Sequence, residues 1–157
     1  MAIIVAALST LLVGMFWYSD AGFGKIWLKE SGLNREELKN SNMLKIFGLT
    51  IIYSLMITMI VSSLVVHQFG AYGMIGGTYD VATTKPSFMA FMNDYGTHFR
   101  TFKHGALHGF VTGLFLILPI IAINALFERK SWKYILIHAG YWIVTLTIMG
   151  AIICGWV

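Results

Sequence analysis

The chain has 157 residues, of which 57% are apolar and 11% charged, and its formal net charge is +4 at pH 7. A soluble domain carries about 25% charged residues, so this chain has too few to cover a soluble globule with polar surface. Its basic residues form no dense run of the kind that binds nucleic acid, so the composition predicts a membrane protein without a nucleic-acid partner.

Four long apolar runs make up most of the chain, and charged residues lie outside them or at their edges. A membrane-spanning helix needs about 20 apolar residues. Backbone groups inside lipid need internal partners, so runs of this length form helices rather than strands. The sequence therefore predicts an all-α integral membrane protein, one domain over residues 1–157, with four transmembrane helices at about 2–19, 46–66, 105–127 and 132–156.

The first run ends in three aromatic residues, Phe16, Trp17 and Tyr18, which we expect at the membrane interface. No Lys or Arg precedes its apolar part, whereas a cleaved signal peptide normally begins with basic residues. We therefore expect a retained first helix.

Basic residues are divided unevenly between the two sides of this topology. Eight lie in or beside the first and third connections, and three lie in the second. Because Lys and Arg favour cytoplasmic loops, residues 25–42 and 128–133 are predicted to be cytoplasmic and both termini to lie outside.

The second connection, residues 67–104, is long and has two parts. Residues 70–77 are rich in glycine and predict a loop, whereas Pro86 is a good first residue for a helix. Apolar residues then recur at helical spacing, which predicts an interfacial helix on the outer leaflet. They are Phe88, Phe91, Met92, Tyr95, Phe99 and Phe102.

Each predicted span carries a line of small or polar residues, the usual means of helix association in lipid. In the third span, "HGALHGFVTG" places Gly105, Gly109 and Gly113 on one face, where another helix can pack closely. The lines together predict a compact four-helix bundle. The other members are Ala6, Thr10 and Gly14; Thr50, Ser54, Thr58 and Ser62; and His138 with Thr145.

The same stretch holds His104 and His108, four residues apart on one helix face. His67 ends the preceding span at the same depth, and His98 lies nearby on the predicted interfacial helix. Such a set could bind a metal ion such as zinc, or haem. The alternative is that these are amphipathic interfacial histidines, in which case no cofactor is expected.

Two further residues have simpler structural explanations. Cys154 is the single cysteine and lies in an apolar helix, so we expect a packed thiol rather than a reactive one. His138 lies inside the fourth span, where a hydrogen bond to Asn124 or to a tyrosine would account for it, although an ionisable group there is also a functional candidate.

Two segments, "GMFWYSDAGFGKIW" at 14–27 and "NALFERKSWKYILIHAGY" at 124–141, resemble the small membrane proteins of the family called domain of unknown function 1761. The resemblance runs along the whole chain in order. It implies a fold with four spans and implies no activity.

The predicted topology also gathers polar residues of these segments at the cytoplasmic face. Lys25, Asn124 and Glu128 are the main members, and we expect a Glu128–Lys25 ion pair to hold the first turn against the third helix. A substrate or proton site at the same place is the alternative.

Catalysis has little support in the sequence, since no nucleophile, base and acid set and no nucleotide-binding motif is present. We expect a non-catalytic accessory or scaffold subunit that associates with a membrane protein partner or with copies of itself. The first alternative is a haem- or metal-binding membrane protein that uses His67, His104 and His108. The second is a small oligomeric transporter.

Overall fold

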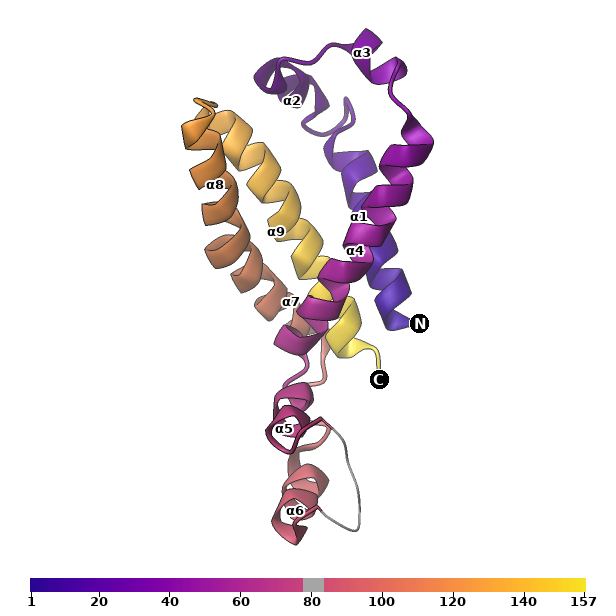
Figure 1. Ribbon diagram of the computed structural model, residues 1–157, viewed down its shortest axis with the longest axis vertical. Coiled ribbons are helices and arrows are strands. Elements are labelled where there is room, and N and C mark those ends of the chain that lie inside the picture. Colours follow the sequence, from indigo (N-terminus) through magenta and orange to yellow (C-terminus); the bar gives the residue numbers. More distant parts are fainter. Residues whose placement is uncertain (78–83) are drawn as a thin grey trace.

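The computed structural model of the protein describes residues 1–77 and 84–157, which contain helices and turns and no strand (Figure 1). Residues 78–83 of the predicted second connection lie outside the described residues. The all-helical class predicted from the sequence is therefore confirmed.

Three helices are long and apolar enough to cross a membrane by length and composition. They are α4 (Met43–Val65), the continuous helix Phe102–Phe127, and α9 (Trp132–Gly155), with 23, 26 and 24 residues. These correspond to the second, third and fourth predicted runs. By the length and composition of these helices the protein is a membrane protein.

The expectation of four full-length spans is corrected to three, because the first helix is too short. α1 (Ala2–Trp17) has 16 residues, about 24 Å at about 1.5 Å per residue, against a hydrocarbon core of about 30 Å. The helix ends where the aromatic residues begin to turn the chain: the Phe23 N–H donates to the Trp17 carbonyl at 2.7 Å, which folds residues 18–23 back. The predicted run of 2–19 counted residues that belong to this turn.

The helix α9 is the centre of the molecule and contacts α1, α4, the helix that contains α7 and α8, and α2 (Gly24–Ser31). Its Leu146 and Met149 are almost completely buried against Ala6 of α1 and Val61 and Val65 of α4. The core is therefore built around one helix, and α1 belongs to it despite its length.

Hydroxyl groups on α4 face this core. Ser54, Thr58 and Ser62 are buried, as expected for a polar line that faces other helices, whereas Thr50 of the same line is only partly buried. The hydroxyls of Thr58 and Ser62 donate to carbonyls one turn earlier in α4, at 2.8 and 2.7 Å. These two hydroxyls find their hydrogen-bond acceptors within α4, so this face contributes close packing rather than hydrogen bonds between helices.

The glycine line predicted in the third run lies against α9. A Cβ atom added to Gly105 would lie 2.0 Å from the Gly150 carbonyl oxygen, and one added to Gly109 would lie 2.0 Å from the Leu146 carbonyl oxygen. One added to Gly113 would come within 2.7 Å of the Ile143 Cα atom. The two backbones therefore touch along three turns, and any side chain at these positions would force them apart.

The third run changes its helical winding in the middle. α7 (Phe102–Thr112) passes into a π-helical turn, η1 (Gly113–Ile117), before α8 (Leu118–Phe127). Pro119 follows directly, and proline lacks the N–H that an α-helix needs and collides with the carbonyl one turn earlier. The wider turn accommodates the proline without ending the helix.

The short segments gather at the two ends of the helices (Figure 1). α2, α3 (Arg35–Lys39) and the turn between α8 and α9 lie at one end, and both chain termini lie toward the other. At the start of α3 the Asn34 side chain accepts from the Glu37 N–H, and the Glu37 carboxylate accepts from the Asn34 N–H, at 2.9 Å each. This capping box holds the short helix in place.

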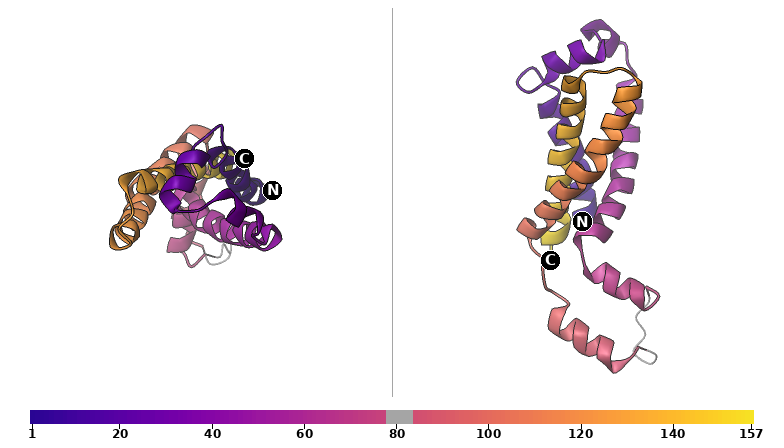
Figure 2. Two further views of the ribbon diagram at one scale, coloured as in Figure 1. Left: turned by 90° about the horizontal axis from the view of Figure 1, so that it is seen from above. Right: turned by 90° about the vertical axis from the view of Figure 1, so that its left-hand side faces the viewer.

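An arm made of α5 (Gln68–Met74) and α6 (Pro86–Tyr95) extends beyond the end of the bundle at which the termini lie (Figures 1 and 2). The sequence predicted a loop over residues 70–77, and this is wrong for 70–74, where α5 includes Gly70 and Gly73. Gly76 and Gly77 follow the helix in a turn with positive φ. The predicted helix from Pro86 is present but ends at Tyr95. Phe99 lies in a turn with φ of 63°, and Phe102 already begins α7.

Candidate functional site

The end of α4 and the start of α7 meet beside the last turn of α9. After α4, Val66 takes an extended conformation, so that His67 turns away as the first residue before α5. The Cys154 thiol of α9 lies 3.2 Å from the Val65 carbonyl oxygen and 3.2 Å from the Phe99 carbonyl oxygen. This buried thiol therefore connects the two chain segments that carry the histidines, a packing role like the one expected for it.

Arg100 fixes the same junction. Its Nε donates to the Cys154 carbonyl at 2.9 Å and its Nη2 to the Trp156 carbonyl at 3.0 Å. A cation at the C-terminus of a helix satisfies unpaired carbonyls and the helix dipole. The next residue, Thr101, caps α7 by accepting from the His104 N–H at 3.2 Å. The first turn of α7, and with it His104, is thus tied to the end of α9.

Three imidazoles converge at this junction, and we call His67, His104 and His108 the histidine cluster. The Nε2 atom of His67 lies 3.3 Å from Nε2 of His108 and 3.4 Å from Nε2 of His104. One ligand atom from each side chain lies within 4.8 Å of the other two. His67 is exposed, and the other two are partly buried, so the cluster opens to the surface.

These spacings match the geometry of a small metal ion. Zinc binds histidine nitrogens at about 2.0–2.1 Å in a tetrahedral arrangement, which places neighbouring ligand nitrogens about 3.3–3.4 Å apart. The two Nε2 distances from His67 lie in that range. Two edges of the tetrahedron are therefore already formed, and the third pair, His104 and His108, has ligand atoms within 4.8 Å of each other.

Hydrogen bonding among neutral imidazoles is the other explanation for the contact. A neutral ring has one N–H donor and one acceptor nitrogen, and an N–H···N contact at 3.3–3.4 Å is longer than the usual about 2.9–3.0 Å of a good N–H hydrogen bond. Hydrogen bonding alone therefore gives a weak reason for the Nε2 atom of His67 to lie this close to those of both His104 and His108.

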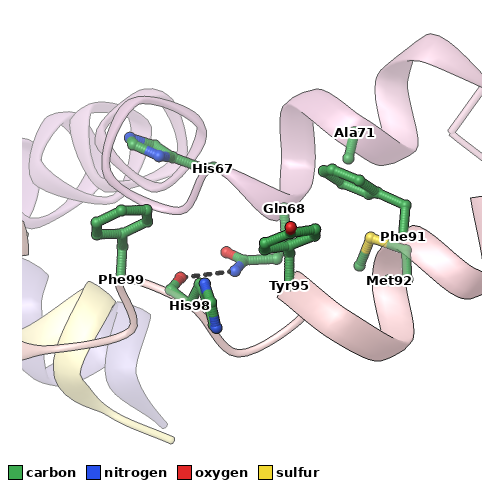
Figure 3. Close-up of a pocket in the computed structure, with 8 residues that line it drawn as sticks. All are labelled: His67, Gln68, Ala71, Phe91, Met92, Tyr95, His98 and Phe99. Atoms are coloured by element: carbon green, nitrogen blue, oxygen red, sulfur yellow. Dashed lines mark hydrogen bonds between the residues drawn. The ribbon is translucent and has the colours of Figure 1, made fainter.

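A fourth histidine at this end of the molecule, His98, does not join the cluster. His98 lines a neighbouring hollow of about 210 Å³ together with His67, Gln68, Phe91 and Tyr95 (Figure 3). Its backbone carbonyl accepts from the Gln68 side chain at 2.9 Å, and its ring meets that of Tyr95 edge-on. Asp94, an acidic residue near His98 in the sequence, lies exposed on α6 outside the cluster.

His138 lies at the opposite end of α9, among aromatic rings. Its Nδ1 is 3.4 Å from the Tyr18 hydroxyl. Of the two partners expected from the sequence, a tyrosine or Asn124, the structure therefore shows the tyrosine. Burial raises the pKa of Tyr18 well above its usual range, and Tyr141 and Tyr134 add to this. Tyr18 therefore stays protonated, and the direction of its hydrogen bond with His138 follows the tautomer of the imidazole. The Nε2 atom of His138 is buried without a partner among the described residues.

The predicted cytoplasmic cluster is more dispersed than expected. Lys25, Asn124 and Glu128 are all exposed, and within residues 1–77 and 84–157 no ion pair joins Lys25 to Glu128. Glu128 instead ends α8. The turn between α8 and α9 is connected to α2 by Ser131, which donates to the Glu30 carboxylate. The acidic residue that connects α2 with the turn between α8 and α9 is therefore Glu30.

Comparison with known proteins gives a family and no activity. The family model described as "Protein of unknown function (DUF1761)" matches residues 1–154. No curated protein and no solved structure matches the chain.

Proposed function

The chain belongs to the DUF1761 family, whose description carries no activity, and we propose from its own geometry that it is a membrane protein that binds a divalent transition-metal ion through His67, His104 and His108. The observation that supports this is the pair of Nε2–Nε2 distances, 3.3 and 3.4 Å, which fits two edges of a zinc tetrahedron. Imidazole ligands without thiolates or carboxylates suit Zn²⁺ and related borderline metals rather than Mg²⁺ or Ca²⁺.

Three protein ligands leave the fourth tetrahedral position open. Structural zinc sites usually close all four positions with side chains, whereas three-ligand sites hold water or an exchangeable group in the fourth. His67 is exposed at the surface, so an ion can enter and leave. We therefore assign the cluster to exchangeable binding rather than to structural stabilisation.

Haem fits this cluster less well than a single ion. A haem held by two axial histidines needs its plane between the two rings. The Nε2 atoms of His67 and His108 are only 3.3 Å apart, which leaves no room for a macrocycle between them.

Metal titration of the purified protein tests the proposal. Chelator-treated protein in mild detergent should bind one Zn²⁺ per chain in isothermal titration calorimetry. Co²⁺ in place of Zn²⁺ should show the intense visible absorption of a tetrahedral nitrogen site. Absence of saturable binding of either ion would contradict the proposal, and so would an octahedral Co²⁺ spectrum.

We further propose that α1 crosses the membrane as a short fourth span, with both termini outside. A span shorter than the bilayer core is accommodated by local thinning, and α1 packs along α9 and α4 in the same layer as the long helices. The basic loops lie together at the other end (Figure 1), as the charge bias requires. The histidine cluster then faces outward.

Labelling with a membrane-impermeant maleimide in intact cells measures this topology. Lys39→Cys should be protected, whereas Ala2→Cys and Thr97→Cys should be labelled, because α1 separates residues 2 and 39. The native Cys154 is buried and gives little background. Labelling of Lys39→Cys alone would reverse the orientation, and labelling of both position 2 and position 39 would show that α1 does not cross.

Association with a partner is a second candidate function, favoured by the arm. Phe91 and Tyr95 of α6 are each 50% exposed although they are large and apolar. The arm stands away from the bundle (Figure 2), so these rings are available to another protein or to the membrane surface. A defined protein that copurifies in stoichiometric amount in mild detergent would support an accessory role.

A further inference from the structure

A large cleft lies at the end of the bundle opposite the histidine cluster, between α1 and α4. Its volume is about 1160 Å³, above the about 300–1,000 Å³ typical of sites for small ligands. The two helices are in contact through their buried halves, around Ala6 and Thr58, and the cleft occupies their other halves. Tyr141 of α9 forms part of its wall. We call it the α1–α4 cleft.

The cleft is apolar along the helices and basic at one end. Leu11, Met15, Ile46 and Phe47 line its length. α3 supplies Arg35 and Lys39 at the end where the helices leave the membrane, and none of the acidic side chains that the structure describes lines the cleft. The apolar length and the basic end follow each other along the helix axis. They match in order the acyl chains and the anionic head group of a lipid that stands upright in a leaflet.

The two basic residues differ in what they can still bind. Arg35 pairs with Asp20, and both side chains are more than half exposed. Lys39 has no ion-pair partner among the described residues. The acids of α3, Glu36 and Glu37, do not line the cleft, and the Glu37 carboxylate is used in the cap of its own helix. A net positive charge therefore remains at the mouth, carried by Lys39.

We propose that the α1–α4 cleft binds one anionic phospholipid of the surrounding bilayer, with an acyl chain between α1 and α4 and its phosphate at Lys39. Basic pockets between transmembrane helices recognise anionic head groups in this way. The complementary charge at the mouth distinguishes this occupant from a neutral lipid. This site is independent of the proposed metal site and lies at the other end of the molecule.

Lipid selectivity measures the proposal directly. Full-length protein is reconstituted in phosphatidylcholine bilayers with trace spin-labelled phosphatidylglycerol or spin-labelled phosphatidylcholine, and the immobilised fraction of each is read by electron paramagnetic resonance. We expect the phosphatidylglycerol probe to be preferred. Lys39→Gln should lower that preference about fivefold, since one basic residue near the surface contributes about 1 kcal/mol to anionic lipid binding.

Two variants separate the cleft from general surface charge. Thr50→Phe fills the cleft from α4 and should remove the immobilised phosphatidylglycerol, whereas Lys29→Gln, a basic residue on α2 that does not line the cleft, should leave it unchanged. Equal retention of the two probes by the unaltered protein would overturn the proposal. So would an effect of Lys29→Gln as large as that of Lys39→Gln. Particles that hold two copies and separate in Thr50→Phe would place a second chain in the cleft and would also overturn it.

Discussion

Replacement of His108 by Ala should abolish stoichiometric zinc binding, and His67→Ala should do the same. Each change leaves two imidazoles at a site that already has an open position, so the affinity should fall by more than about 100-fold, the upper range for loss of a merely supporting residue. Competition with a chromophoric zinc chelator measures the change. Binding should also weaken in acid, because imidazole must lose its proton before it can ligate.

His98→Ala is the matched control for these variants. It removes a histidine from the same end of the molecule, but one that lies outside the cluster and lines the neighbouring hollow (Figure 3). Its zinc affinity should equal that of the unaltered protein. If all three variants bind zinc equally well, the metal lies elsewhere and the short Nε2 contacts have only a packing origin.

The histidine cluster could be anticipated from the sequence because its information is local. The four-residue spacing of His104 and His108 places both on one face of any helix. Predicting that His67 lies near them required one further step. Successive spans cross the membrane in opposite directions, so the end of one span lies at the same level as the start of the next. His98 is also close to His104 in the sequence, but a turn separates the two. In this turn Phe99 has a positive φ, which no pattern in the sequence indicates.

The residues that position the cluster could not be found in this way. Arg100 was counted only as one basic residue of an outer loop, yet it binds two carbonyls at the end of α9, more than fifty positions away. Gly150 was one glycine in an apolar run, and only its contact with Gly105 shows that the close approach of the helices is mutual. Both contacts join segments that are far apart in the sequence, and hydrophobic periodicity carries no information about such contacts.

The length of α1 shows the opposite error, a pattern given too much weight. Apolar and aromatic residues were counted together as far as residue 19, although aromatic residues at a membrane interface often mark the place where a helix ends. Trp17, the last residue of α1, and Tyr18 directly after it bind α9: the Trp17 indole donates to the Ile137 carbonyl at 3.0 Å, and Tyr18 contacts His138. Composition alone cannot distinguish these side chains from lipid-facing ones.

Gly109→Ala should destabilise the protein by about 1–3 kcal/mol, the usual cost of forcing a methyl group into a packed interior. The added Cβ would lie 2.0 Å from the Leu146 carbonyl oxygen and 2.9 Å from the Thr147 Cα atom, both of which are backbone atoms that cannot rotate away. Thermal unfolding in detergent gives the measurement. Gly48→Ala on α4 is the same chemical change in open space, with no atom within 4 Å, and should be neutral or stabilising by up to about 1 kcal/mol through helix propensity.

The same substitution also connects the packing of α7 with the metal site. Gly109 adjoins His108, and one turn earlier Gly105 adjoins His104, so a displacement of α7 from α9 carries both imidazoles with it. His67 belongs to the segment that follows α4, so we expect a shift of α7 to change its distances to His104 and His108. Gly109→Ala should therefore weaken zinc binding as well as the fold, whereas Gly48→Ala should change neither. Unchanged thermal stability in Gly109→Ala would mean that α7 and α9 are farther apart than the structure has them. Normal zinc affinity in a destabilised Gly109→Ala protein would mean that the three histidines are held by contacts other than the α7–α9 interface.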